Sequence, residues 1–370
     1  MSTSVLFEER ATSGGQLIGL ATLNSEKTLN SLTLEMVELL LGRLNQWQRD
    51  ERVVSVLIRA AGEKAFCAGG DVQALYHSAR ENPGGPCDHA ERFFEQEYRL
   101  DYLLHNYSKP VIAWGHGIVM GGGLGVFAGC SHRVVTERTR IAMPEVTIAL
   151  FPDVGGSYFL NRMPGRVGRF LALTGASINA ADCLYTGIAD YFVSADSQQK
   201  LLDQLADIAW TDSAEKNHQL MAECLDGLHQ ACSGQLPEGR VEKHFEQINS
   251  LCSGSDIYEI SRAISDLETE DSWLVKARQA MLSGSPLAVL WIYRQLELCR
   301  EMPLKQVFQQ ELQLATNIIR HPEFTEGVRA LLIDKDRQPK WQFPSIDEVP
   351  TDVLDNFFQS PWSENPLADL

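Results

Sequence analysis

The stretch KPVIAWGHGIVMGGGLGVFAG, residues 109–129, decides the fold. An apolar run suited to a buried parallel strand leads into a glycine cluster, and a helix of small residues follows that cluster. Glycines at a strand-to-helix junction leave backbone N–H groups uncovered at the positive end of the helix dipole. The stretch therefore predicts a β-turn-α unit whose turn can hold an anion.

The same alternation of strand and helix signals runs along the chain up to about residue 200. Residues 5–10 and 17–24 predict two strands separated by a Gly-Gly turn, and residues 32–50 carry apolar side chains at helical spacing. Residues 53–60 form another short apolar run of the kind found in buried parallel strands. We expect an α/β core over residues 1–200, built from repeated β-turn-α units.

After about residue 200 the sequence changes to long helical stretches. Three breaks interrupt them, SGQLPEG at 233–239, CSGSD at 252–256 and LSGSP at 282–286. These breaks combine Gly, Pro and Ser, which mark loops. We expect residues 201–370 to form a helical C-terminal region packed on the α/β core.

Composition excludes several classes of protein. The 370 residues include eight cysteines with no C-x-x-C pair, which argues against a zinc site or a disulfide framework. A net charge of -17 opposes binding to nucleic acid or to anionic membranes. The N-terminus lacks a basic targeting region, and no apolar run approaches the roughly 18 residues of a membrane helix. We therefore expect a soluble, cytoplasmic protein.

Three interpretations of the glycine cluster compete. Gly123, Gly125 and Ala128 satisfy the dinucleotide pattern G-x-G-x-x-A, although far from the first β-strand. The glycines can equally serve only to let the helix pack closely. In the third interpretation they form an oxyanion hole, which needs a second backbone donor. CAGGDV, residues 67–72, is a candidate for that donor, with Asp71 capping the next helix.

Two carboxylates follow the glycine stretches, Glu145 in MPEV and Asp153 in FPDVGG. Their apolar surroundings would desolvate them and raise their pKa values, which suits a base, an acid or a nucleophile. Alternatively, Asp153 caps the helix that follows it and Glu145 lies on the surface. His116 is better explained as a packed structural residue than as a base. The chain has no G-x-S-x-G, Walker A or H-E-x-x-H motif.

At these residues the sequence resembles the crotonase (enoyl-CoA hydratase/isomerase) superfamily. AFCAGGDV is similar to the first oxyanion-hole segment, and HGIVMGGGLGVFAGCSHRVVTERTRIAMPE is similar to the second segment and to the strand that carries a catalytic acid. The resemblance implies a crotonase-like ββα superhelix core and an acyl-CoA thioester substrate. It also implies that the backbone N–H groups of Gly70 and Gly122 hold the thioester oxygen.

Within the superfamily, the details favour the 3-hydroxyisobutyryl-CoA hydrolase branch. Hydratases carry a glutamate where this sequence has Gly125, so simple alkene hydration is doubtful. The pair Glu145 and Asp153, and FTEGVRALLIDKDRQPKW at 324–341, are similar to the hydrolase family. EQEYRL also matches, and by position Glu97 would line the acyl pocket. The resemblance implies hydrolysis of 3-hydroxyisobutyryl-CoA, and of 3-hydroxypropionyl-CoA as well, with a place in valine breakdown.

The resemblance also implies roles for the candidate residues. Glu145 would attack the thioester carbonyl or act as a general base for water, and Asp153 would bind the 3-hydroxyl group or assist departure of the thiolate. Glu97 would recognise the same hydroxyl. The residues expected to bind the CoA moiety are Lys64, Ala65, Phe66 and Ala68, although Lys64 can equally be an ordinary exposed lysine.

No metal or redox cofactor is implied, because coenzyme A is part of the substrate. The superfamily often forms homo-oligomers, and the sequence does not fix their number. Two alternatives stay open: an enoyl-CoA hydratase or isomerase, and a non-catalytic acyl-CoA binding protein. The intact glycines and both carboxylates argue against the second of these.

Overall fold

The computed structural model describes residues 3–370, which form two compact units. The sheet unit comprises residues up to 70, 99–141 and 178–242. The helical unit comprises residues 71–98, 142–177 and 243–370. Each unit gathers separate stretches of the chain, and the boundary expected near residue 200 stays a prediction.

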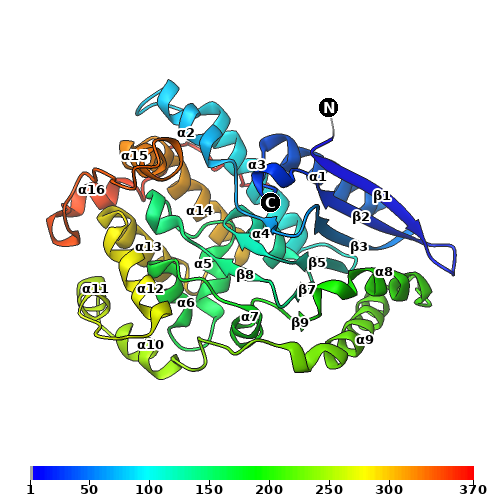
Figure 1. The fold of residues 1–370 in the computed structure, drawn as a ribbon. Coiled ribbons are helices and arrows are strands. Elements are labelled where there is room, and N and C mark those ends of the chain that lie inside the picture. The colour runs from blue at the N-terminus through cyan, green and yellow to red at the C-terminus, as the bar shows by residue number, and fades with distance from the viewer. Residues whose placement is uncertain (1–2) are drawn as a thin grey trace. The chain divides into compact units, whose positions relative to one another are not determined.

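Two sheets form the core of the sheet unit, and most of their strands run parallel (Figure 1). In the larger sheet β1 pairs antiparallel with β2, and β2, β3, β5, β7 and β9 follow in parallel order. Its strands are β1 (Val5–Ala11), β2 (Leu17–Leu23), β3 (Val53–Ala60), β5 (Val111–Gly115), β7 (His132–Val135) and β9 (Tyr191–Phe192). The smaller sheet has the strand order β4 (Ala65–Cys67), β6 (Ile118–Met120) and β8 (Arg140–Ala142). The last residue of β8, Ala142, belongs to the helical unit. The predicted strands and their parallel pairing are confirmed.

The helix predicted at residues 32–50 is α1 (Leu34–Arg49), and it packs against β1 and β2 of the larger sheet. Thr33 accepts a hydrogen bond from the N–H of Met36 and caps the helix. Trp47 is buried at the other end, where its indole N–H donates to Glu9. A Cβ on Gly19 of β2 would lie 2.8 Å from the Trp47 ring, so glycine lets helix and strand approach closely.

The remaining helices of the sheet unit connect and flank its strands. They are α4 (Gly122–Gly129), α7 (Ala180–Thr186), α8 (Gln198–Asp207) and α9 (Ala214–Cys232), with short 3₁₀ turns at Glu26–Thr28, Ala195–Ser197 and Ser233–Gln235. Helices α8 and α9 follow β9 in the chain and lie side by side (Figure 1). The glycine-rich α4 is buried along its whole length.

The helical unit is built almost entirely from helices. They are α2 (Val72–Glu81), α3 (Asp88–His105), η2 (Glu145–Ile148), α5 (Gly156–Phe159), η3 (Leu160–Arg162), α6 (Val167–Thr174), α10 (Phe245–Leu251), α11 (Ile257–Ser265), α12 (Ser272–Ser283), α13 (Pro286–Cys299), α14 (Leu304–Ile319), α15 (Pro322–Val328), the π-turn η6 (Arg329–Ile333), η7 (Ile346–Glu348) and α16 (Thr351–Asn356). Helix α3 belongs to this unit up to Tyr98 and to the sheet unit from Arg99. The helical C-terminal region is confirmed. Within residues 3–370, no helix is long and apolar enough to cross a membrane.

Helix starts coincide with the predicted loop signals. Asp256 ends the break CSGSD and accepts the N–H of Glu259 as the N-cap of α11. In LSGSP, Ser285 caps α13 and Pro286 occupies its first position, where a missing N–H costs nothing. The loops predicted from Gly, Ser and Pro therefore lie at the ends of helices in the structure.

Candidate active site

The two predicted oxyanion-hole segments lie side by side in the sheet unit. Strand β4, in the first segment, pairs in parallel with β6, in the second. A Cβ on Gly123 would lie 2.6 Å from both the Cβ and the backbone oxygen of Cys67. Glycine at 123 is therefore needed for α4 to approach β4, and the packing interpretation of the cluster holds for this position.

The backbone around Gly70 and Gly122 leaves two N–H groups available. Gly69 and Gly121 both adopt positive φ angles, 115° and 48°, which glycine tolerates and other residues rarely adopt. The N–H of Leu32 donates to the Gly69 carbonyl at 2.9 Å and pins the first turn. Among residues 3–370, the N–H groups of Gly70 and Gly122 have no hydrogen-bond acceptor. Both are thus free to bind an oxyanion, the role predicted for them.

The residues expected near the CoA moiety differ in exposure. Lys64 is exposed and Ala68 is half-buried, whereas Ala65 and Phe66 are buried. The Phe66 ring packs edge-on against Phe127, with 6.4 Å between ring centroids. Any contact of Ala65 or Phe66 with a ligand would therefore use the backbone, and the CoA assignment stays a prediction.

Two other residues of these segments have structural roles, as predicted. Asp71 caps α2 by accepting the N–H of Ala74 at 3.2 Å. His116 is buried, and its Nε2 lies 2.9 Å from the Gly62 carbonyl oxygen.

Glu145 lies in the helical unit as the first residue of the short turn η2. Its side chain is 5% exposed, so the alternative that places it on the surface is wrong. Burial, with a further contribution from the Asp153 carboxylate, raises the pKa of Glu145 well above its ordinary value. Within residues 3–370, its buried Oε2 atom has no hydrogen-bond partner. A desolvated carboxylate with an unpaired oxygen suits a nucleophile or a base.

Asp153 is buried in the same unit, in the loop that precedes α5. The phenol O–H of Tyr98 donates to its Oδ2 at 2.7 Å. Burial raises the pKa of Asp153 to about 6, against the opposing effect of the Tyr98 hydrogen bond. The N-cap of α5 is Gly155, and no side chain caps this helix, so the alternative in which Asp153 caps it is wrong. Its carboxylate lies instead among other acids.

Glu97, the third predicted carboxylate, lies on α3 and is 2% exposed. Its charge helps to raise the pKa of the adjacent Tyr98, after burial, Asp153 and Glu311. The phenol therefore stays protonated and acts as a donor. The helical unit thus contains Glu97, Glu145 and Asp153, whereas both glycine stretches belong to the sheet unit.

Sequence reasoning missed two residues of this acidic cluster, Tyr98 and Glu311. Tyr98 follows Glu97 directly, but nothing in EQEYRL indicates that its hydroxyl reaches Asp153. Glu311 had a detectable signal, because it falls between Phe308 and Ala315 on the apolar face of α14. A carboxylate on a buried helix face is uncommon and marks a candidate functional residue.

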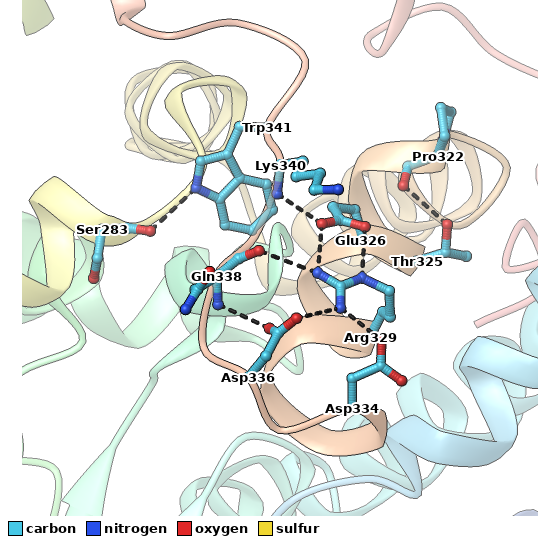
Figure 2. A network of polar contacts seen from close by, with 10 residues as sticks. All are labelled: Ser283, Pro322, Thr325, Glu326, Arg329, Asp334, Asp336, Gln338, Lys340 and Trp341. Carbon is cyan, nitrogen blue, oxygen red and sulfur yellow. Dashed lines mark hydrogen bonds and ion pairs between the residues drawn. The ribbon is translucent and has the colours of Figure 1, made fainter.

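The C-terminal signature at 324–341 folds around Arg329 (Figure 2). Its guanidinium forms ion pairs with Glu326, Asp334 and Asp336 at 2.7–2.8 Å and donates to the Gln338 carbonyl at 3.1 Å. Trp341 follows this network, and its indole N–H donates to the Ser283 carbonyl (Figure 2). The signature is thus a compact, self-bonded segment.

Helix α15, at the start of this signature, supports the turn that carries Glu145. A Cβ on Gly327 would lie 2.6 Å from the carbonyl carbon of Ile148, the last residue of η2. Glu323 accepts the Ser285 hydroxyl at 2.7 Å, and the N–H of Ser285 donates to the Val146 carbonyl at 3.2 Å. Helix α15 therefore supports the backbone of η2 directly at Gly327 and indirectly, through Ser285, at Glu323.

Across residues 3–370, no group of three or more His, Cys, Asp and Glu side chains is arranged to hold a metal ion.

Comparison with known proteins identifies the family. The family model for enoyl-CoA hydratase/isomerase matches residues 18–358. The chain therefore belongs to the enoyl-CoA hydratase/isomerase family. An acyl-CoA substrate fits this family, and the resemblance to crotonases is confirmed.

Similar proteins of known name belong to one branch of this family. The chain is 38% identical to the mitochondrial 3-hydroxyisobutyryl-CoA hydrolase of Gallus gallus, over 94% of this chain and 88% of the relative. It is 36% identical to the Homo sapiens protein of the same name, over 92% and 86% of the two chains.

Solved structures share the fold over the full length. A Rhodobacter sphaeroides enoyl-CoA hydratase matches with a TM-score of 0.83 and 30% identity, over 97% of this chain and 98% of that chain. A carnitinyl-CoA dehydratase from Mycobacterium thermoresistibile matches with a TM-score of 0.84 and 31% identity over 100% of both. The crotonase-like core with a helical C-terminal part is therefore confirmed.

One expectation is contradicted by the relatives. Their names place them in mitochondria, against the cytoplasmic location expected from the sequence. The expectation rested on composition and on the absence of a targeting pattern. Mitochondrial import depends on a targeting peptide, and the composition of a folded domain gives no information about the compartment.

Proposed function

We propose that this protein hydrolyses the thioester of 3-hydroxyisobutyryl-CoA, releasing the hydroxy acid and free CoA. The observation that carries the proposal is the buried pair Glu145 and Asp153, in a chain with Gly125 where hydratases have a glutamate. The named relatives at 36–38% identity support the same activity. 3-Hydroxypropionyl-CoA, which lacks one methyl group, is a second substrate. The reaction belongs to the breakdown of valine.

Glu145 is the nucleophile in this proposal. Its carboxylate attacks the thioester carbonyl, and the resulting tetrahedral intermediate expels the CoA thiolate to leave a mixed anhydride, which water cleaves. Backbone N–H groups of Gly70 and Gly122 stabilise the oxyanion. One such donor contributes about 3–4 kcal/mol in enzymes of this mechanistic type. In the second version of the mechanism, Glu145 acts as general base for direct attack by water.

Asp153 and Glu97 act on the acyl group and the leaving group. A carboxylic acid with a pKa of about 6 exchanges its proton near neutral pH. Asp153 therefore assists departure of the CoA thiolate or binds the 3-hydroxyl group, and Glu97 recognises that hydroxyl. The backbone at Ala65, Phe66 and Ala68, together with the Lys64 ammonium group, binds the CoA moiety. The proposed reaction uses no metal or redox cofactor.

Hydration or isomerisation of an enoyl-CoA is the second candidate. The solved structures at 30–31% identity are named as a hydratase and a dehydratase, which favours it. Gly125 opposes it, because glycine has no side chain to supply the carboxylate that hydratases have at this position.

A substrate panel separates the two candidates. Purified protein is incubated with 3-hydroxyisobutyryl-CoA, crotonyl-CoA and acetyl-CoA, while free thiol and enoyl absorbance are followed independently. The proposal requires thiol release from the first substrate and little from the other two. Loss of enoyl absorbance from crotonyl-CoA without thiol release would exclude it. Borohydride added during turnover distinguishes the two versions of the mechanism, because it reduces an acylated Glu145 to a primary alcohol that peptide mass analysis detects.

A further inference from the structure

Glu311 is a buried acid for which the mechanism above provides no role. It lies on α14 with no exposed surface, between apolar residues of the same helix face. Burial, together with the charge of Asp153, raises the pKa of Glu311 to about 8, against the opposing effect of two backbone hydrogen bonds. A buried acid is costly for the fold unless hydrogen bonds satisfy its oxygens.

Both oxygens of Glu311 bind the loop that follows Asp153. Oε2 accepts the N–H of Gly155 at 2.8 Å, and Oε1 accepts the N–H of Ser157 at 2.9 Å. Both oxygens of a carboxyl group can accept a hydrogen bond, whether or not the group carries a proton, whereas a glutamine side chain has one acceptor oxygen. Glu311 therefore clamps two backbone amides that lie two residues apart.

The clamped loop is strained. Val154 and Gly155 have φ angles of 53° and 83°, and the left-handed region is especially unfavourable for a β-branched residue such as Val154. Strained backbone of this kind persists where surrounding contacts over-determine it. Inside the loop, the N–H of Gly156 donates to the Asp153 carbonyl at 2.6 Å, so the clamped residues are bonded directly to Asp153.

Helix α14 also contacts the residue that binds the Asp153 side chain. The Tyr98 ring, whose hydroxyl donates to Asp153, lies 5.9 Å from the Phe308 ring, centroid to centroid. Phe308 precedes Glu311 by one turn of α14. One helix therefore fixes the backbone that carries Asp153 and supports the phenol that orients its carboxylate.

We propose that Glu311 is a positioning residue for thioester hydrolysis, which sets the Asp153 carboxylate by clamping the backbone of residues 155–157. The inference rests on the proposed function for the reaction that Asp153 serves. Glu311 acts through the loop and does not touch the substrate. Of the titratable groups that interact with Asp153, Tyr98 comes from α3, Glu145 from η2 and Glu311 from α14.

The clamp itself is tested without any enzyme assay. Hydrogen exchange, followed by peptide mass analysis, is compared between the wild-type protein and Glu311→Gln. The amides of residues 154–158 should exchange at least about tenfold faster in the variant, because one acceptor is lost, while peptides of β3 and β5 stay unchanged. Unchanged exchange at 154–158 would overturn the proposal, whatever reaction the protein catalyses.

The consequence for catalysis is tested by a double-mutant cycle with Tyr98→Phe. Glu311→Gln alone should lower kcat about 10- to 100-fold with KM within about threefold, since small misplacements of a reacting group have effects of this size. In the Tyr98→Phe background, Glu311→Gln should lower kcat by a clearly smaller factor than it does in the wild-type background, because both residues act through Asp153.

Glu323→Gln is the matched control. Glu323 is another buried glutamate of the helical unit that accepts two hydrogen bonds, from the Ser285 hydroxyl and the Gln342 N–H. Its effect on kcat should be the same with and without the Tyr98 hydroxyl. The positioning role would be overturned if Glu311→Gln and Tyr98→Phe had additive effects on the free energy of activation. It would also be overturned if Glu323→Gln were coupled to Tyr98→Phe as strongly as Glu311→Gln is. If the wild-type protein releases no thiol, the proposed function fails, and the exchange experiment still decides whether the clamp exists.

Discussion

Removal of the Tyr98 hydroxyl should move the pH dependence of hydrolysis upward. The Tyr98 hydroxyl donates to the Asp153 carboxylate at 2.7 Å, and both side chains are buried. A hydrogen bond of this kind favours the charged form of the acid, so its loss in Tyr98→Phe raises the pKa of Asp153. The ring itself is retained, and with it the packing on Phe94 and Phe308.

The size of the change follows from the energy of the bond. A buried hydrogen bond to a charged group contributes about 1.5–3 kcal/mol, and about 1.4 kcal/mol corresponds to one pH unit. The pKa of Asp153, about 6 in the wild-type protein, should therefore rise by about one to two pH units. If Asp153 must be ionised, the acid limb of the profile moves upward. If Asp153 must be protonated, the alkaline limb moves upward. The limb that moves therefore shows which protonation state of Asp153 is active.

The assay is the pH profile of kcat/KM for thiol release, which reports ionisation in the free enzyme. Tyr107→Phe is the matched control, because the Tyr107 hydroxyl is buried and donates to the Leu44 carbonyl, within the sheet unit. That control should leave both limbs in place. A Tyr98→Phe profile that stays within about 0.3 pH units of wild type, or moves downward, would refute the reasoning.

Two further predictions follow from the contacts of the helical unit. Gly327→Ala should lower kcat about tenfold or more with little change in KM, because its Cβ would lie 2.6 Å from the backbone of Ile148, in the turn that carries Glu145. The control Gly227→Ala, on α9 with no atom within 4 Å of the added Cβ, should preserve kcat and raise stability by up to about 1 kcal/mol. Stability should also fall as pH rises from about 5 to 8. Over this range the folded state keeps a proton on Glu311, whose pKa is about 8, and the unfolded state releases it. Melting temperatures against pH should therefore decline less steeply for Glu311→Gln, and equal slopes would contradict this assignment.

Local signals in the sequence are sufficient for much of the fold. The apolar run at 53–60 forms β3, the glycine junction forms the start of α4, and Asp71 caps α2. Each of these features depends on neighbours within a few residues, so the pattern contains the information. Glu145 and Asp153 were recognisable as candidates for the same reason, since prolines and apolar residues surround both in the chain.

Long-range contacts could not be predicted in this way. Glu311 lies 156 residues from Gly155, the residue whose N–H it accepts, and no local pattern connects them. The left-handed backbone at Val154 contradicts the preference of a β-branched residue, so only the assembled unit explains it. The sequence also left open whether Glu145 is buried, because burial depends on helices α13 and α15, which follow more than 100 residues later.

The central claim is that Glu145 performs thioester hydrolysis on an acyl-CoA, and Glu145→Gln tests it most directly. Thiol release from 3-hydroxyisobutyryl-CoA is measured beside the binding of the same substrate, with melting temperature as a check of the fold. The account predicts a loss of about 1,000-fold or more in kcat, because the amide cannot attack the thioester or accept a proton from water, while the substrate still binds within about threefold of wild-type affinity. Thiol release that stays within a few fold of the wild-type rate would contradict the account.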